Sequence, residues 1–430
     1  MPKPVASENS ANTSSCLDEY DPAALSVDSA RNKILEAVAP VSGTEQLALR
    51  QTLNRILAND VYSPMDVPPA TNSAMDGYAF AGTDLELAQS SGLHVTGTAY
   101  AGRPFQGKLT TGECVRIFTG AILPPGTDTV AAQERVTRSN DAQPDVILLD
   151  STTRSGDNVR QAGEDISAGD CVLKAGTRLQ AAELGLLASL GIGEIHVRRR
   201  VRVAFFSTGD ELRSIGEPLE PGMLYDSNRY SLYGLLSSAG CELLDMGVVR
   251  DTPEATEKAF ALAAENADVL ITSGGVSVGD ADYVKTTLDA FGQVNFWKVA
   301  MKPGRPLAFG KINNTVFFGL PGNPVSVMVT FYQFVQQALR KMMGETFTQP
   351  LIVRAVCQSR LRKRAGRFEF QRGILTRNNE GQLIVSKTGQ QGSGILSSMT
   401  RANCFILLPE TMTDIEAGME VEVQPFGQFF

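Results

Sequence analysis

Histidine is nearly absent from this chain, which has only His94 and His196 among its 430 residues. Neither lies in a motif, so we interpret both as structural, and the sequence gives little support for histidine catalysis or a His-ligated metal. The six cysteines are scattered and form no Cys-x-x-Cys pair. This pattern favours free thiols in a reducing cytoplasm over a disulfide framework or a zinc site.

Long apolar runs are also missing, because no stretch reaches the roughly 18 apolar residues that predict a membrane span. Met1–Ser15 is polar and lacks the apolar centre of a signal peptide, so we expect a disordered tail over residues 1–20 and a cytoplasmic protein. A net charge of −8 argues against a nucleic-acid surface. The basic run Arg360–Arg372 is the exception; its cations are interleaved with Leu and Phe, so we interpret most of them as part of a solvated strand face.

The most informative feature that is present is a glycine-rich turn. An apolar strand, Asp268–Thr272, leads into a segment that contains three glycines and then the carboxylates Asp280 and Asp282, where a helix is expected to begin. Glycines allow backbone N–H groups to converge on an anion, and a helix start adds its positive dipole end. Aspartates in the same turn indicate a hard cation between carboxylate and phosphate, most simply Mg²⁺. A glycine turn with an aspartate helix cap is the alternative.

Three further apolar strands end in polar turns, and helices follow them. The strands are expected at Val201–Phe206, Cys241–Val249 and Asn314–Leu320. This alternation predicts an α/β domain with a doubly wound, mainly parallel sheet, which binds its ligands at the carboxyl ends of the strands. Glu211 and Asp251 would share that edge with Asp282, although each could instead be an independent helix cap.

A cationic segment comes next in the chain. Phe296–Pro306 holds the only tryptophan together with Lys298, Lys302 and Arg305. Lys298 and Lys302 are four residues apart, so on a continuous strand they would project from one face. Their charge suits phosphate or another oxyanion, whereas a solvated basic loop is the alternative.

With these stretches, five other motifs form an ordered set. They are Asp66-Val-Pro-Pro with Asn72-Ser-Ala-Met-Asp-Gly-Tyr-Ala, Arg116-Ile-Phe-Thr-Gly-Ala, Gly163-Glu-Asp-Ile, Phe368-Glu-Phe-Gln-Arg-Gly and Gln391-Gly-Ser-Gly. From about Asp18 onward the chain resembles the molybdopterin molybdotransferase family, the molybdenum insertion enzymes of MoeA and gephyrin type. The sheet domain alone would be weak evidence, since molybdopterin adenylyltransferases share it.

The resemblance implies a multidomain plan and an elongated homodimer with an active site between two subunits. An amphipathic helix is expected at Ser26–Ala39, and Thr44–Ala58 also looks helical. Short apolar strands after Pro350 predict a small C-terminal β barrel. The domains expected are an elongated N-terminal domain (21–61 and 162–200), an inserted β-rich domain (62–161), a molybdopterin-binding α/β domain (201–345) and a β-barrel domain (346–430).

The reaction implied by the resemblance is insertion of molybdate into adenylylated molybdopterin, with release of AMP. Mg²⁺ would be held by Asp251 and Asp282, with Glu211 assisting. Asp76, Thr119 and Asp165 match positions tied to activity in the family and would reach the pocket only from the other subunit. Lys298 is expected on the metal and phosphate side. The substrate-binding candidates are Ser273, Gly274, Gly275, Ser277, Gly279, Lys302, Arg305, Pro306, Asn323, Ser326, Arg372 and Ser393.

Within that set, Lys302, Arg305, Arg372 and Ser393 look like a molybdate pocket. Many relatives have Lys where this chain has Arg305. The planar guanidinium of Arg keeps the charge of a Lys ammonium but changes its geometry, which leaves insertion of tungstate open as an alternative to molybdate. Transient contacts with the adenylyltransferase and with apo-molybdoenzymes are expected from the pathway. Two other functions stay open on sequence: a molybdopterin adenylyltransferase, and a non-catalytic scaffold.

Overall fold

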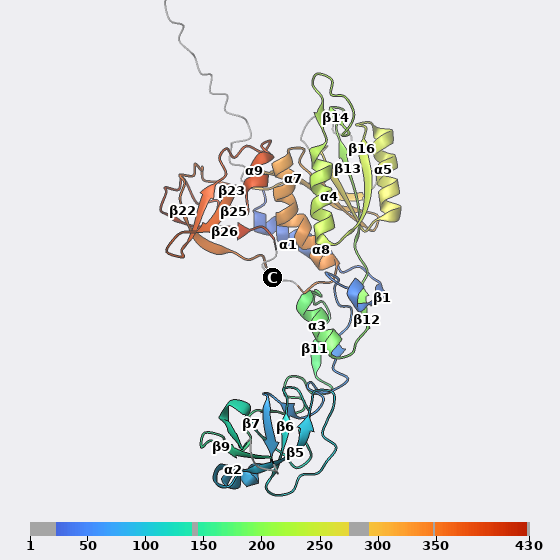
Figure 1. Ribbon diagram of the computed structural model, residues 1–430. Helices are drawn as coiled ribbons and strands as arrows, with labels where there is room; N and C mark the ends of the chain where they lie inside the picture. The colour runs from blue at the N-terminus through green and yellow to red at the C-terminus, as the bar shows by residue number, and fades with distance from the viewer. Residues whose placement is uncertain (1–22, 140–144, 275–291, 347–348, 428–430) are drawn as a thin grey trace, which may run out of the picture. The chain divides into compact units, whose positions relative to one another are not determined.

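The structure is a computed structural model, and it describes residues 23–139, 145–274, 292–346 and 349–427. The chain forms two compact units (Figure 1). Unit 1 comprises Met1–Glu45 and Arg198–Phe430, and unit 2 comprises Gln46–Val197. The five finer domain segments expected from the sequence stay predictions. Among the described helices, none is both long and apolar enough to cross a membrane.

The larger sheet of unit 1 has the strand order β16-β13-β17-β21-β20-β18. Its strands are β13 (Arg202–Thr208), β16 (Glu242–Val249), β17 (Val269–Ser273), β18 (Gly292–Lys298), β20 (Pro306–Ile312) and β21 (Thr315–Leu320). Neighbours are parallel from β16 to β21, whereas β20 is antiparallel to both β21 and β18. The predicted mainly parallel sheet is therefore confirmed, with β20 as its reversed strand.

Helices α4 (Ser227–Ala239) and α5 (Pro253–Asn266) lie on opposite sides of β13 and β16 (Figure 1). On the α5 side, Phe206 of β13 packs with Phe260 and Phe317 in an apolar cluster. Because side chains alternate along a strand, the next residue, Ser207, faces α4. Thr252 caps α5 through its side chain, which accepts from the Ala255 backbone N–H, and Pro253 is the first residue of the helix.

The N-terminal helix α1 (Val27–Ala37) belongs to unit 1. Ser26 caps it, and Val27, Ala30 and Ile34 are buried, which confirms the amphipathic helix expected there. α1 packs against the continuous helical run of α7 (Pro324–Thr330), η5 (Phe331–Val335) and α8 (Gln336–Met342). This run follows β21 directly.

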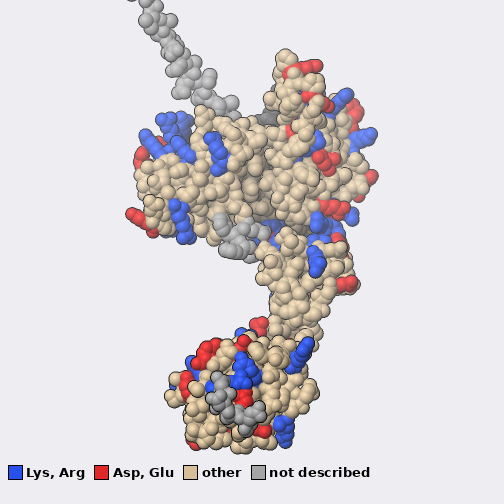
Figure 2. Space-filling view, viewed as in Figure 1, with Lys and Arg blue, Asp and Glu red and all other residues tan. Residues whose placement is uncertain are grey.

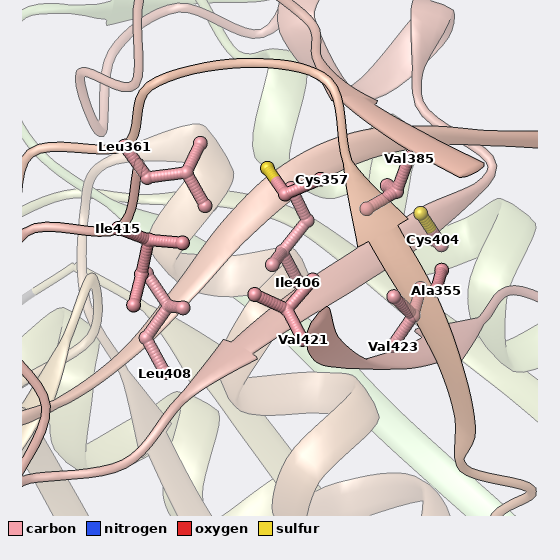
Figure 3. Close-up of a cluster of buried hydrophobic side chains, with 10 residues drawn as sticks. All are labelled: Ala355, Cys357, Leu361, Val385, Cys404, Ile406, Leu408, Ile415, Val421 and Val423. Carbon is pink, nitrogen blue, oxygen red and sulfur yellow. The ribbon is translucent and has the colours of Figure 1, made fainter. Parts of the chain in front are cut away.

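The C-terminal strands close into a five-stranded barrel, as predicted. They are β22 (Val353–Cys357), β23 (Phe368–Arg377), β24 (Leu383–Lys387), β25 (Cys404–Leu408) and β26 (Glu420–Pro425). The ring closes because β23 pairs with both β24 and β25. Its interior holds alternating side chains such as Ile406, Leu408 and Val423 (Figure 3). The short strand β19 (Met301–Lys302) joins the edge of β23, and helix α9 (Ser397–Arg401) precedes β25.

Unit 2 contains a mixed sheet of order β7-β4-β6-β5-β9-β8. Its strands are β4 (Gly77–Phe80), β5 (Leu93–Ala99), β6 (Glu113–Ile117), β7 (Thr129–Ala132), β8 (Val136–Ser139) and β9 (Val146–Leu149), with helix α2 (Leu85–Ser90) beside them. The rest of the unit holds α3 (Ala181–Ser189) and the short ladders β2 (Val61–Tyr62) with β11 (Cys171–Leu173) and β3 (Asn72–Ser73) with β10 (Val159–Arg160).

The helix expected at Thr44–Ala58 is wrong. The chain forms strand β1 (Thr44–Ala48), which pairs with β12 (Glu194–Arg198), and then a single 3-10 turn, η2 (Leu49–Gln51). Glu45 and Leu47 are half-buried while their neighbours are exposed, so the burial follows the two-residue period of a strand. Pairing with a distant strand outweighs the helical propensity of this segment.

Candidate functional site

The carboxyl edge of the unit 1 sheet gathers five chain turns. β13, β16, β17 and β21 are parallel and end on this edge. β18 also ends there, because it runs antiparallel to the reversed strand β20, and Lys298 pairs with Pro306 at its last position. The turns start at Gly209, Arg250, Gly274, Val299 and Pro321. Candidate residues that are far apart in the sequence thus share one rim.

The acidic part of the rim lies after β13 and β16. Burial raises the pKa of Asp251, and the nearby charges of Asp210 and Glu211 raise it further. Glu211 folds back over its own turn, since a Cβ at Gly209 would lie 2.6 Å from Glu211 Oε2. Its backbone carbonyl accepts from the Leu224 N–H at 2.8 Å.

In the described part of the chain, no three His, Cys, Asp or Glu side chains come close enough to hold a metal by themselves. Magnesium commonly takes one or two protein carboxylates and completes its shell with phosphate and water. The carboxylates that crowd around Asp251 therefore fit Mg²⁺ as a donor set that a phosphate would complete. Asp282, the other predicted ligand, lies outside the described residues.

The glycine-rich turn after β17 is described as far as Gly274. Ser273 is buried, and the Gly274 N–H donates to the Leu320 carbonyl at 3.1 Å. Gly274 has φ of 92°, and a Cβ there would lie 2.5 Å from the Thr208 carbonyl oxygen, so glycine is required on both counts. The predicted phosphate-binding residues Gly275, Ser277 and Gly279 lie outside the described residues.

Lys298 and Lys302 are not on one strand, which corrects the prediction. Lys298 ends β18, whereas Lys302 belongs to β19, which pairs with β23 of the barrel. The chain crosses between the two sheets at Val299 and Ala300, and the Ala300 carbonyl accepts from the Phe368 N–H at 2.8 Å. Lys302 Nζ then lies 3.9 Å from the buried Glu369 carboxylate. The crossing places Lys302 on the barrel side of the rim.

Arg305 and Pro306 return the chain to the sheet. The Arg305 carbonyl accepts from the Val299 N–H at 2.8 Å, so this loop closes on itself beside Lys298. Gly304 packs against α7, where a Cβ would lie 2.7 Å from Thr330 Oγ1. Arg305 is half-buried at this junction.

The loop after β21 links the sheet to the barrel. Asn323 precedes α7 with an extended backbone and forms no side-chain cap, and Ser326 is buried in the helix. The Val325 N–H donates to the Ser393 carbonyl at 3.0 Å. This bond holds the Gln391-Gly-Ser-Gly loop of the barrel against the start of α7.

Arg372 supports the same barrel loop from beneath. Its side chain is 1 % exposed, with Nε donating to Ser398 Oγ and Nη2 to the Gly392 carbonyl, each at 3.0 Å. Burial lowers the pKa of Arg372 to about 10, which still leaves it a cation at neutral pH. The Arg372 side chain thus binds Gly392, the residue directly before Ser393, and places a buried positive charge next to this loop.

The remaining predicted residues belong to unit 2. Asp76 Oδ1 accepts from both the backbone N–H and the hydroxyl of Thr119, at 2.8 and 2.7 Å. These bonds lower the pKa of Asp76 and keep it an anion. Asp165 is exposed, and its backbone N–H donates to the Val67 carbonyl. It lies in a loop and caps no helix.

A polar group that the sequence reading missed lies under the rim, at the start of α4. Asp226 caps α4 and accepts from Ser207 Oγ at 3.0 Å. Asn228 donates to Ser273 Oγ at 2.8 Å and to the Gly322 carbonyl at 2.6 Å. In the sequence, the tripeptide Asp226-Ser-Asn228 resembles an ordinary helix cap. Only the structure shows that Asp226 and Asn228 are both buried and bind neighbouring strand ends.

The geometry therefore defines a site that handles anions, made from a sheet edge and a barrel loop within unit 1. On the face drawn in Figure 2, Lys and Arg predominate over the barrel, whereas both signs of charge cover the sheet part. Carboxylates suited to a metal lie after β13 and β16, and cations lie at the junction with the barrel. Carboxylates and cations from distant parts of the sequence thus lie along one edge of unit 1.

Comparisons with known proteins match one protein family along nearly the whole chain. Family models match residues 25–191 (MoeA N-terminal region, domain I and II), 204–341 (probable molybdopterin binding domain) and 354–426 (MoeA C-terminal region, domain IV). The molybdopterin molybdenumtransferase of Haemophilus influenzae is 46 % identical over 404 residues, covering 94 % of this chain and 99 % of that one. The one from a Nostoc species is 37 % identical over 388 residues, covering 88 % of each chain.

Solved structures of the same family also match this chain. A molybdopterin biosynthesis MoeA protein from Pyrococcus horikoshii matches with a TM-score of 0.81 and 29 % identity, covering 94 % of this chain and all of that one. The chain belongs to the MoeA family of molybdopterin molybdenumtransferases. The resemblance found in the sequence motifs is confirmed, and the molybdenumtransferase function is supported over the adenylyltransferase and scaffold alternatives.

Proposed function

We propose that this protein inserts molybdate into adenylylated molybdopterin and releases AMP, that it depends on Mg²⁺, and that it acts as a homodimer. The observation that carries the proposal is the junction at Lys302 and Ser393. There, backbone hydrogen bonds join the barrel segments that carry Lys302 and Ser393 to the carboxyl edge of the sheet, which we propose binds phosphate. One reactant is an oxyanion and the other carries phosphates, so the reaction needs an oxyanion site and a phosphate site next to each other.

The sheet residues suit the phosphate end of the substrate. Ser273 offers a hydroxyl at a strand end, and Gly274 lets the backbone approach closely. Mg²⁺ would be held by Asp251 and Asp282, with Glu211 assisting, and would neutralise charge on the phosphates. Lys298, at the end of β18, adds a cation on the same edge.

The barrel residues suit the oxyanion. Arg372 is positively charged, desolvated and fixed by two hydrogen bonds, so its position is set before any substrate binds. Lys302 and Arg305 add charge at the junction, and the Ser393 hydroxyl supplies a directional donor to a tetrahedral oxyanion. Because Arg305 presents a planar fork, we expect molybdate to be held at two of its oxygens there, and tungstate is a matched competitor.

The dimer part of the proposal concerns Asp76, Thr119 and Asp165. Asp76 is an anion held by Thr119, which suits it to orient a substrate group by accepting a hydrogen bond from it. We propose that a second subunit supplies these residues to the site. Transient contacts with the preceding adenylyltransferase and with apo-molybdoenzymes would deliver the substrate and receive the product.

An insertion assay tests the reaction. Purified protein is mixed with adenylylated molybdopterin, molybdate and Mg²⁺, and AMP release and active cofactor are followed together. We expect both products to appear in step, and neither without Mg²⁺. AMP without active cofactor would contradict the oxyanion assignment at Lys302, Arg305, Arg372 and Ser393. Adenylylation of free molybdopterin with ATP would instead favour the adenylyltransferase activity, and no reaction in either assay would favour a scaffold.

A further inference from the structure

The buried start of α4 bridges two of the turns on the rim. The Asn228 side chain is 9 % exposed, and its amide nitrogen donates to Ser273 Oγ at the end of β17 and to the Gly322 carbonyl after β21. One side chain thus ties together the start of the glycine-rich turn and the loop before α7. Neither β17 nor β21 is adjacent to α4 in sequence, so this link exists only in the folded chain.

The orientation of the Asn228 amide is fixed by its partners. A backbone carbonyl can only accept a hydrogen bond, so the amide nitrogen must face Gly322. The same nitrogen reaches Ser273 Oγ, so both of its N–H groups are used. Asn228 Oδ1 is buried and accepts no hydrogen bond within the described residues.

This direction of bonding decides what Ser273 can do. A hydroxyl has one proton to donate and two lone pairs that accept. Asn228 donates to the hydroxyl oxygen, so the Ser273 proton stays available for another acceptor. A phosphate presents only acceptors, and therefore a serine that binds it must donate. Asn228 leaves Ser273 in the state that phosphate binding needs.

We propose that Asn228 is a positioning residue for the nucleotide phosphate of the substrate. It holds the turns after β17 and β21 at a fixed separation and orients the Ser273 hydroxyl as a donor. This inference rests on the proposed function, because it assumes that the rim binds an adenylylated substrate.

AMP binding in the presence of Mg²⁺ tests it, measured by calorimetry on the full-length protein. Asn228→Ala removes both bonds, and we expect AMP affinity to fall about tenfold. Asn228→Asp keeps the shape but offers only acceptors. It would take the Ser273 proton and face the Gly322 carbonyl with charge, so we expect a loss of about thirtyfold or more. Asn266→Ala is the matched control, since the Asn266 side chain is exposed and donates to the Leu262 carbonyl within its own helix, α5.

Two readouts separate positioning from a general loss of structure. Molybdate affinity depends on the barrel residues, so it should stay within about twofold of the wild type in both variants, and the thermal midpoint should change by only a few degrees. Parallel losses of AMP binding, molybdate binding and thermal stability would overturn the proposal in favour of a structural role.

The remaining outcomes are equally decisive. If Asn228→Asp binds AMP as the wild type does while Asn228→Ala does not, side-chain shape matters and the donor argument fails. If both variants bind AMP normally, Asn228 positions nothing. A wild-type protein that binds no AMP would overturn the proposed function, and this inference with it, whereas normal wild-type binding with unaffected variants overturns this inference alone.

Discussion

At the scale of single residues, Arg372 is the strongest test of the oxyanion pocket. Burial destabilises its charged form, and at neutral pH, below both the folded and the unfolded pKa, that penalty is fully present. Retaining such a cation is reasonable where an anion compensates it. Arg372→Lys keeps the charge but cannot reach Ser398 and Gly392 together, so we expect molybdate affinity to fall about tenfold or more.

Arg372→Met separates binding from stability. Ser398 Oγ still donates to the Ile395 carbonyl at 2.7 Å, so an apolar side chain of similar length leaves it satisfied. We expect this variant to unfold at the same temperature as the wild type or above it, while molybdate binding is lost. Arg377→Met, exposed at the end of the same strand, is the control for both measurements. Molybdate bound normally by Arg372→Met would remove Arg372 from the pocket.

Asp251 gives a second residue-scale prediction, for which the sign matters. Its pKa is raised, so ionisation costs stability; this cost is fully present above the folded pKa, declines as the pH falls below that value, and is gone below the unfolded pKa. Asp251→Asn should therefore raise the thermal midpoint slightly, by about 1–2 °C, when Mg²⁺ is absent at neutral pH. Glu242→Gln, an exposed change at the start of β16, is the control.

With Mg²⁺ present, the wild type should have a higher thermal midpoint than Asp251→Asn. It is expected to stabilise the wild type by mass action and to leave Asp251→Asn unchanged. Insertion activity should be lost in the variant. Thermal scans of both proteins with and without Mg²⁺ make the comparison. Equal stabilisation of wild type and variant by Mg²⁺ would place the metal elsewhere.

At the scale of secondary-structure elements, the barrel is attached to the helical run by an aromatic cluster. Tyr332 of η5 stacks on Phe426 with ring centroids 5.3 Å apart and meets the edge of Phe405 at 5.7 Å. A buried Gln333 to Gln424 hydrogen bond of 2.8 Å lies beside it. Since Ser393 and Arg372 belong to the barrel, loosening this attachment should disturb the oxyanion side before the phosphate side.

Tyr332→Ala tests that attachment. Removing a large aromatic side chain from the junction is expected to cost about 2–4 kcal/mol of unfolding free energy, seen as a lower urea midpoint. Molybdate affinity should fall more than AMP affinity. Tyr233→Ala on α4 removes the same ring from an exposed position and should change little. Equal losses of both ligands would contradict the idea that the junction serves the oxyanion pocket.

Elements were predictable where local chemistry marks their ends. The strands before Gly274 and Pro321 and the Thr252 cap of α5 follow from apolar runs that stop at glycine, proline or a hydroxyl. Pairings with distant strands were not predictable. Lys302 leaves the strand of Lys298 because β19 pairs with β23, some 65 positions further along the chain, and β1 forms because β12 returns beside it.

The same limit applies to the candidate site. Aspartates in turns and lysines near prolines can be read from residue type, whereas burial cannot. Arg372 lay in a run that looked like a solvated strand face, yet it is buried, and only its place in a family motif singled it out. Asn228 carried no signal of its own, because it follows Asp226 in what looks like an ordinary helix start. Side chains that act through their neighbours become visible only when the contacts are known.

At the scale of the whole molecule, the proposed homodimer makes a quantitative prediction. Asp76 belongs to unit 2 and Asp251 to unit 1. If each site takes Asp251 from one subunit and Asp76 from the other, Asp76→Asn and Asp251→Asn should each abolish insertion. A heterodimer of the two variants would then contain one site with both changes and one site with neither.

Coexpression of the two variants under separate tags tests this arrangement. With equal expression and random pairing, half of the dimers are mixed and each has one intact site, so about a quarter of wild-type activity is expected. Mixed dimers isolated through both tags should reach about half, because one of their two sites is intact. If instead both residues act within one chain, every site carries a change and no activity returns. Sedimentation of the wild type as a monomer would contradict the dimer directly, and activity in either variant alone would remove that residue from the site.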